Sequence, residues 1–171
     1  MSPESHEQKR LGHKFIIAMW IALMGLVFFL FNNILEQDYN PNQDVNTVIK
    51  GQLREVILKR NRYGHYVSKG TINKQPVTFL LDTGASDISI PDKIAKNLRL
   101  SYGQARQYQT ANGIITSYLT ELNQVSIGQI ELNNIRASIN PNMEHDEILL
   151  GMSFLKHIEF TQRGDTLILR Q

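Results

Sequence analysis

The sequence predicts an all-β domain, a small β-barrel or sandwich, preceded by a single N-terminal transmembrane helix. After residue 52 the chain consists of short alternating apolar and polar runs separated by turn residues, a spacing typical of such β domains. Before it, one uncharged apolar run is long enough to cross a membrane. These observations divide the chain into an N-terminal segment 1–14, a transmembrane anchor 15–35, a linker 36–52 and a folded domain 53–171.

The apolar run from Phe15 to Phe31 reads FIIAMWIALMGLVFFLF and carries no charge. As a helix it spans roughly 25 Å, and Ile34 and Leu35 extend it toward the thickness of a bilayer core. A cleaved signal peptide is the alternative. Signal peptides have shorter apolar runs and a small-x-small cleavage site, which the following FNNILEQ does not offer, so we expect an uncleaved anchor.

Basic residues flank this run on one side. Lys9, Arg10 and Lys14 precede it, whereas residues 32–46 contain no Lys or Arg. Because positively charged flanks stay inside, we expect a single-pass membrane protein with a cytoplasmic N-terminus, whose folded domain faces the periplasm or the cell exterior. The Asn-rich residues 36–52 show no sustained periodicity and predict a linker.

The folded domain begins with a predicted hairpin in which LREVILK and HYVSKGTI flank the turn RNRYG. VTFLL follows the turn NKQP. The next hairpin joins QARQYQTA to IITSYLTEL through Asn112 and Gly113, since both residue types tolerate positive φ. QVSIG and IELNNIRASI are further strands, and HIEFTQ and TLILR flank the turn RGD. Helical patterns are confined to PDKIAKNL, where Pro91 suits a first turn, and MSFLKH.

Composition excludes several classes of function. The 18 basic and 16 acidic residues give a net charge of +2 without an aromatic-interleaved basic stripe, so we expect no nucleic-acid partner. The chain has no cysteine, which excludes a thiol nucleophile and thiolate zinc sites. His145, Asp146, Glu147 and His157 lack the HExxH spacing and are better explained by a polar loop, so we expect no metal and no other cofactor.

Asp82 has an unusual setting in FLLDTGASDISI, because it directly follows an apolar strand and enters a turn that contains Gly84. An Asx turn explains many Asp-Thr-Gly triplets. Here LLDTGAS is followed in order by TANG and ILLGMSFL. With these three motifs, residues 53–170 resemble the retropepsin-like aspartic proteases of clan AA, in particular their membrane-anchored, single-domain bacterial members.

This resemblance implies an acid protease fold, a closed β-barrel with one or two short helices, for residues 53–171. Asp82 matches the catalytic aspartate, Thr83 the residue that braces the paired active-site loops, and Gly84 the glycine that lets those loops pack closely. The strand that passes the catalytic loop matches Ile148, Leu149, Leu150 and Gly151.

The hairpin about Asn112 matches the flap that closes over a bound peptide. We expect substrate contacts from Ala85, Tyr108, Thr110, Asn112 and Gly113, with a plain edge-strand role as an equal alternative for Tyr108 and Thr110.

Hydrolysis in this family uses a water activated between two carboxylates, and this chain offers one matching aspartate. The other acids considered, none of which is followed by Thr-Gly or Ser-Gly, are Asp87, Asp92, Asp146 and Asp165. The resemblance therefore implies a homodimer in which Asp82 of each copy meets at a two-fold axis.

We expect an aspartic endopeptidase that cleaves peptides or proteins between hydrophobic residues. Because Ala85 has no hydroxyl to hydrogen-bond the outer carboxylate oxygen, we expect activity in the weakly acidic to neutral range. A non-catalytic periplasmic peptide-binding module on the same fold is the alternative, since a fold does not guarantee activity. The intact Asp82, Thr83 and Gly84 favour the enzyme.

Overall fold

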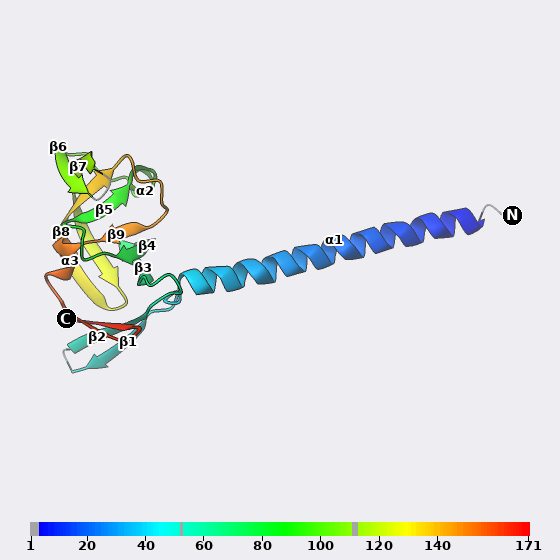
Figure 1. Ribbon diagram of the computed structural model, residues 1–171, viewed down its shortest axis with the longest axis horizontal. Coiled ribbons are helices and arrows are strands. Elements are labelled where there is room, and N and C mark those ends of the chain that lie inside the picture. Colours follow the sequence, from blue (N-terminus) through cyan, green and yellow to red (C-terminus); the bar gives the residue numbers. More distant parts are fainter. Residues whose placement is uncertain (1–3, 52, 111–112) are drawn as a thin grey trace. The chain divides into compact units, whose positions relative to one another are not determined.

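The computed structural model describes residues 4–51, 53–110 and 113–171 of the chain (Figure 1). It divides into two compact units, Met1–Asp38 and Tyr39–Gln171. Helix α1 (Glu4–Tyr39) makes up the described part of the first unit and ends at the start of the second. The second unit contains β1 (Asn46–Lys50), β2 (Leu53–Lys59), β3 (Val67–Ile72), β4 (Gln75–Leu81), β5 (Ile88–Pro91), α2 (Asp92–Asn97), β6 (Ala105–Thr110), β7 (Gly113–Ile127), β8 (Ile130–Asn140), β9 (Ile148–Leu150), α3 (Met152–Leu155), β10 (Glu159–Arg163) and β11 (Thr166–Arg170).

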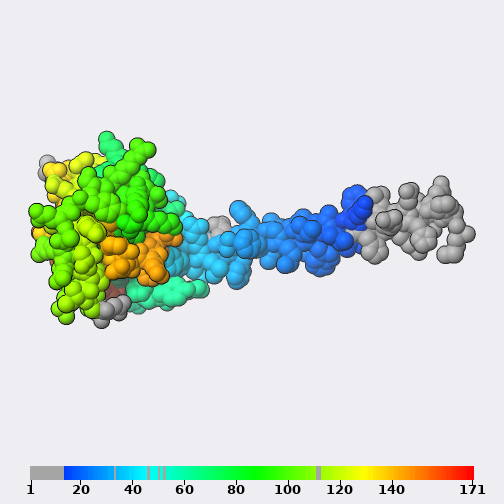
Figure 2. All heavy atoms as spheres, turned by 90° about the horizontal axis from the view of Figure 1, so that it is seen from above, coloured from blue at the N-terminus to red at the C-terminus, as the bar shows by residue number. Residues whose placement is uncertain are grey.

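Helix α1 contains the predicted anchor, residues 15–35, and extends beyond it at both ends. Its part Lys14–Tyr39 is long and apolar enough to cross a membrane. The described side chains of this part are exposed (Figure 2). The helix ends two residues before Pro41, because a proline disfavours helical backbone at the residue that precedes it.

Residues 36–52, expected to form a linker, contain the last turn of α1 and strand β1, which pairs with β2. Asn42 attaches this segment to the domain. Its side-chain amide donates to the carbonyl oxygens of Lys59 and Val67 at 2.9 and 2.7 Å, and its Oδ1 accepts from the N–H of Lys59 at 2.7 Å. A buried side chain with all of these partners fixes the backbone around it. One of the polar side chains in this segment, Asn42, therefore holds the segment against the folded domain.

The strands of the second unit form two sheets. The smaller sheet has the order β1-β2-β11-β10, and the larger one has the order β3-β4-β9-β5-β8-β7-β6. β7 also pairs with β3 through Thr71↔Ser126 and Ile72↔Val125, so the larger sheet closes on itself. Every second residue from Val56 to Leu58 on β2 and from Leu167 to Leu169 on β11 is buried, and the residues between them are half-buried, which gives the smaller sheet one face toward the core.

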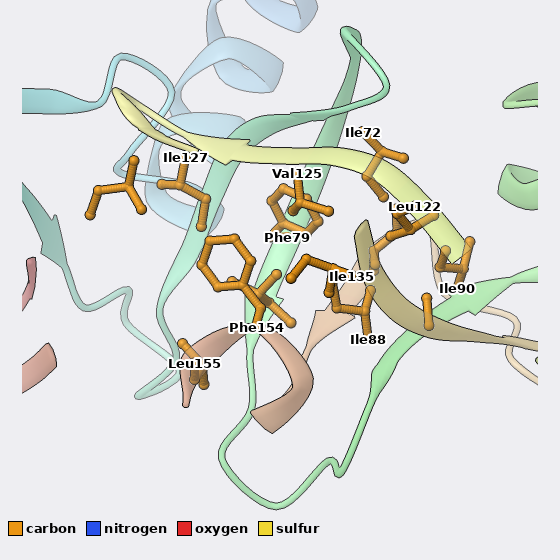
Figure 3. Close-up of a cluster of buried hydrophobic side chains, with 14 of the residues drawn as sticks. Ile72, Phe79, Ile88, Ile90, Leu122, Val125, Ile127, Ile135, Phe154 and Leu155 are labelled. Atoms are coloured by element: carbon orange, nitrogen blue, oxygen red, sulfur yellow. The ribbon is translucent and has the colours of Figure 1, made fainter. Parts of the chain in front are cut away.

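The core lies inside the larger sheet and is closed at one end by α3. Phe154 of α3 points into the same cluster as Phe79 of β4 and Ile88 of β5 (Figure 3), and all three side chains are fully buried. Burying a side chain of this size contributes about 1.5–3 kcal/mol. Because Phe79 lies three residues before Asp82, the core holds the end of β4 in place.

The sequence predicted this all-β domain with two short helices after an apolar helix, and two local details differ. The runs read as separate strands, IITSYLTEL and QVSIG, are one strand, β7. Gly113, expected as a turn residue, is the first residue of β7 and pairs with Thr110. Its φ of 110° is accessible to glycine because no Cβ is present. Residues 111–112, which follow Thr110 and include Asn112, lie outside the described residues.

Candidate active site

Asp82 lies at the end of β4, where that strand runs parallel to β9. The register pairs Phe79 with Ile148 and Leu81 with Leu150. The N–H of Asp82 continues the ladder by donating to the carbonyl oxygen of Leu150 at 3.2 Å. Ile148 and Leu150 are fully buried, so the predicted apolar strand fixes the backbone from which the carboxylate projects.

The turn after Asp82 holds the carboxylate in one orientation. The N–H of Gly84 donates to Asp82 Oδ1 at 2.8 Å, and the N–H of Ala85 donates to the Asp82 carbonyl at 3.3 Å. A Cβ on Gly84 would lie 3.2 Å from Oδ1, close enough to require a shift. Asp82 is half-buried, whereas Thr83 and Gly84 are exposed. One carboxylate oxygen is thus fixed by the backbone, and the turn itself is open to an incoming partner.

Gly151 allows α3 to pack against the far side of this turn. A Cβ on Gly151 would lie 2.5 Å from the carbonyl oxygen of Ala85 and closer still to that of Asp87. Beyond it, the N–H groups of Met152 and Ser153 donate to the carbonyl oxygens of Ala85 and Ser86 at 2.8 and 2.9 Å. The predicted residues from Asp82 to Ala85 and from Ile148 to Gly151 are therefore brought together.

A pocket of about 290 Å³ opens beside the carboxylate. It is lined by Tyr66, Leu81, Asp82, Thr83, Leu155, Phe160, Gln162 and Leu167. The Tyr66 hydroxyl is buried and has no hydrogen-bond partner among the described residues. A larger hollow of about 520 Å³ beside Asn61 and Asp165 includes neither Asp82 nor Thr83. The pocket at Asp82 thus places this carboxylate beside the apolar side chains of Leu81, Leu155 and Phe160.

The predicted flap is the hairpin of β6 and β7, at the top of the domain in Figure 1. Near its turn, the Thr110 hydroxyl donates to the carbonyl oxygen of Gly113 at 2.8 Å. Both residues are exposed and lie on a different element from Asp82. Tyr108, by contrast, is half-buried, and its side chain contacts the segment that follows the Asp82 turn.

This contact is made with Asp87, whose side chain is only 2% exposed. The Tyr108 hydroxyl donates to Asp87 Oδ2 at 2.7 Å. Arg136 of β8 donates to Asp87 Oδ1 from Nε at 2.9 Å and from Nη2 at 2.8 Å. The buried carboxylate thus has a partner on each oxygen, and it joins the flap, β8 and the Asp82 turn.

The same contacts change the acidity of both partners of Asp87. Burial, and then the hydrogen bond to Asp87, raises the pKa of Tyr108 above its ordinary value of 10.0. The hydrogen bond and charge of Asp87 raise the pKa of Arg136. Tyr108 therefore stays a hydrogen-bond donor, and Arg136 a cation, at any pH near neutrality.

Comparisons with known proteins relate this geometry to a family. Residues 68–157, which include the Asp82 turn, the flap and the strand before Gly151, match the family model described as "gag-polyprotein putative aspartyl protease". The chain belongs to the retropepsin-like aspartic protease family.

A solved relative has the same fold. The crystal structure of a retropepsin-like aspartic protease from Rickettsia conorii is 34% identical in sequence, with a TM-score of 0.59, and the match covers 74% of this chain and 95% of that one. The family resemblance and the retropepsin-like all-β fold predicted from the sequence are both confirmed.

Two curated relatives match over nearly the whole chain. An uncharacterized protein of Sinorhizobium sp is 32% identical over 90% of this chain and 72% of its own length. An uncharacterized protein of Rickettsia prowazekii is 31% identical over 91% of this chain and 70% of its own length. The likeness to these two proteins thus extends well beyond residues 68–157, the part that matches the family model.

Several residues around Asp82 carry no signal in the sequence that points to this site. The sequence suggests Asp87 only as a rejected candidate for a second catalytic acid, and it does not single out Arg136, Tyr66 or Phe160. A local signal existed for Asp87, because the buried strand β5 starts directly after it and a charge beside a buried strand needs a partner. The identity of that partner, 49 residues away in sequence, had no local signal.

Proposed function

We propose that this chain is a membrane-anchored aspartic endopeptidase that hydrolyses peptide bonds with a water activated between the Asp82 carboxylates of two copies. The observation that carries the proposal is the placement of Asp82. A half-buried carboxylate, with one oxygen fixed by the N–H of Gly84, lines an apolar pocket in the fold of the retropepsin-like aspartic proteases.

The chemistry explains why one carboxylate per chain requires a second chain. Two carboxyl groups about 3 Å apart cannot both ionise, so the pair holds one proton. The ionised group takes a proton from water as that water attacks the peptide carbonyl carbon. The protonated group donates to the carbonyl oxygen, and a proton is then delivered to the departing amine nitrogen as the C–N bond breaks. The proton taken from water thereby ends on the amine.

The remaining site residues bind and orient the peptide. We propose that an extended substrate lies between the Asp82 turn and the flap, with contacts from Ala85, Tyr108, Thr110, Asn112 and Gly113. Strand-like pairing with the flap gives affinity that tolerates many sequences, and the apolar walls favour hydrophobic side chains beside the cleaved bond. Because Ala85 offers no hydroxyl to the dyad, the proposed enzyme works at weakly acidic to neutral pH.

Helix α1 is the proposed membrane anchor. Support comes from its apolar part Lys14–Tyr39 and from the basic residues Lys9, Arg10 and Lys14, which favour a cytoplasmic N-terminus in the inner membrane. The protease domain then faces the periplasm. Alkaline phosphatase, which is active only outside the cytoplasm, tests this when fused after Gln171. An active fusion agrees with the topology, and an inactive but well-expressed fusion contradicts it.

The test of the activity uses the full chain in detergent. We expect the wild type to cleave a diverse peptide mixture between about pH 4 and about pH 7, with Asp82→Asn inactive. Asp165→Asn is the matched control, because it makes the same change at a carboxylate 77% exposed in a hairpin turn. Equal cleavage by the wild type and Asp82→Asn contradicts the proposal. Peptide binding without cleavage by the wild type identifies a peptide-binding module instead.

A further inference from the structure

The folded domain begins at the last residue of the proposed anchor helix. Tyr39 ends α1 and is also the first residue of the second unit. The Asn61 side chain donates to the carbonyl oxygen of Tyr39 at 2.9 Å, and the Tyr39 hydroxyl donates to Glu147 Oε1 at 2.7 Å. Asn40 and Asn42, which follow, are only 5% and 3% exposed. The chain is thus bound to the domain from the point where it leaves the helix.

A short path joins this docked segment to Asp82. The Asn42 side-chain amide donates to the carbonyl oxygen of Val67, and Val67 pairs with Leu80 across β3 and β4. Leu80 lies two residues before Asp82. One side chain, one strand pairing and two residues of β4 and its turn therefore separate Asn42 from the carboxylate.

A second path leads to the same point through β9. The Tyr39 hydroxyl contacts Glu147, which directly precedes β9, and the carbonyl oxygen of Leu150 at the end of β9 accepts from the N–H of Asp82 at 3.2 Å. A chain extends by at most about 3.6 Å per residue, and paired strands lie about 5 Å apart. Each path therefore places Asp82 within roughly 30 Å of Tyr39.

Tyr39 marks the level of the bilayer surface when α1 spans the membrane. The apolar part of the helix reaches Leu35, and Tyr39 follows four residues later, a rise of about 6 Å. Tyrosine is enriched at this level of membrane proteins, where its ring lies among the lipid headgroups. The path length from Tyr39 to Asp82 is therefore the greatest height that the carboxylate can reach above the headgroups, whichever way the domain turns.

We propose that the substrates of this protease are segments of other membrane-anchored proteins that lie within about ten residues of the bilayer surface. This inference rests on the proposed function, because it names the substrate class of the Asp82 site. An extended peptide of about nine residues spans 30 Å, so a bond at this spacing from the membrane reaches the carboxylate. A substrate held in the same membrane also has a high effective concentration at the pocket.

The pocket beside Asp82 fits such segments. Its apolar lining includes Leu81, Leu155 and Phe160, and Phe160 remains 41% exposed. Membrane proteins carry many aromatic and apolar side chains where the chain leaves the bilayer. A short segment of this kind can present these side chains in an extended form, whereas a folded soluble protein keeps its own in a core.

Anchored substrates that carry one cleavable segment at two heights test the proposal. In the near substrate, about eight Gly/Ser residues separate the segment from a transmembrane helix. In the far substrate, a rigid helical spacer of about forty residues lifts the same segment about 60 Å from the bilayer. Each is reconstituted in vesicles with the full chain, and a soluble peptide of the same sequence measures intrinsic activity. We expect cleavage of the near substrate to be about tenfold faster or more.

Lengthening the connection tests docking as the cause. An insertion of about thirty Gly/Ser residues between Asp38 and Tyr39 keeps the contacts of Tyr39 and Asn42 and adds about 30 Å of average reach. This variant should cleave both anchored substrates at similar rates and leave cleavage of the soluble peptide unchanged. The same insertion after Ser5, before the anchor, is the control and should behave as the wild type. Equal cleavage of the near and far substrates by the wild type overturns the proposal.

Energy transfer gives a readout that is independent of cleavage. The chain has no cysteine, so Gln162→Cys in an Asp82→Asn chain places one donor dye at an exposed position of the pocket lining. With acceptor dyes on the lipid headgroups, the insertion after Asp38 should lower the transfer roughly twofold or more. Equal transfer in the two chains overturns the proposal. Transfer that falls as expected in a protein that cleaves no peptide supports the short reach and counts against the enzyme alone.

Discussion

The hydroxyl of Tyr108 donates to the carboxylate of Asp87 at 2.7 Å, and this bond ties the predicted flap to the segment that follows the Asp82 turn. Asp87 is five residues after Asp82, and its second oxygen is held by Arg136. Because the carboxylate is almost fully buried, each of its partners matters both for stability and for the position of the flap.

We expect Tyr108→Phe to lower the free energy of unfolding by about 1–2 kcal/mol, because it removes a hydrogen bond to a buried charge. Loss of this bond should also leave the flap less firmly positioned for substrate binding, so KM should rise more than kcat falls. Denaturant unfolding and steady-state cleavage measure the two effects. Tyr102→Phe is the control, since the Tyr102 hydroxyl makes a bond of the same length to the more exposed Asp92. Equal effects of the two variants on KM would contradict the role given to Tyr108.

Arg136→Met should destabilise the domain by about 2 kcal/mol or more, because it leaves the Asp87 carboxylate buried without its cation. The double variant Arg136→Met/Asp87→Asn also removes the unpaired buried charge, so it should recover part of the lost stability. Lys93→Met breaks an ion pair in which both side chains are about three-quarters exposed, and it should have little effect. Thermal and denaturant unfolding of the wild type and the three variants tests this order. A double variant less stable than Arg136→Met would count against it.

Stability should fall at alkaline pH in a way that depends on Tyr108. Burial and Asp87 raise the pKa of Tyr108 in the folded state above the value of 10.0 expected in the unfolded state. A group with a raised folded-state pKa contributes stability that is complete below the unfolded pKa and is lost as pH rises through the folded pKa. Urea unfolding between about pH 8 and about pH 11 should therefore show a decline that is less steep in Tyr108→Phe. Identical slopes for the two proteins would refute the assignment.

Gly151→Ala should abolish cleavage and cost about 3 kcal/mol or more, because a Cβ there collides with the backbone carbonyls of Ala85 and Asp87. Gly164→Ala is the control. Its φ of 57° disfavours alanine, but no atom lies within 4 Å of the added Cβ, so about 1 kcal/mol is expected. Circular dichroism, unfolding and cleavage assays distinguish the two. An active, stable Gly151→Ala protein would show that the Asp82 turn and α3 can move apart without loss of stability or cleavage.

Features with local causes could be predicted from the sequence. The short helices followed from their apolar spacing, and the RGD hairpin followed from turn chemistry, with Gly164 at a φ of 57°. Asp82 could be singled out because an acid directly after an apolar strand is unusual, and the order of the three motifs then indicated the family.

Features that depend on distant residues could not be predicted in this way. Strand β1 exists because it pairs with β2 and because Asn42 docks on the backbone of Lys59 and Val67, which no periodicity reveals. The pairing of Asp87 with Arg136 likewise depends on β5 lying beside β8. The short path from Asn42 to Asp82 became visible only when the strand pairing was known.

The central claim is that one site uses Asp82 from two copies, and a mixing experiment tests it most directly. A fixed amount of wild-type chain is reconstituted in vesicles with increasing amounts of the Asp82→Asn chain, and peptide cleavage is measured. If copies pair at random and both carboxylates are needed, an equal amount of the variant should lower cleavage to about half, and a large excess should suppress it. Added Asp165→Asn chain should instead raise cleavage. Wild-type activity that stays constant at every ratio, in vesicles where fluorescently labelled chains demonstrably exchange partners, would contradict the account.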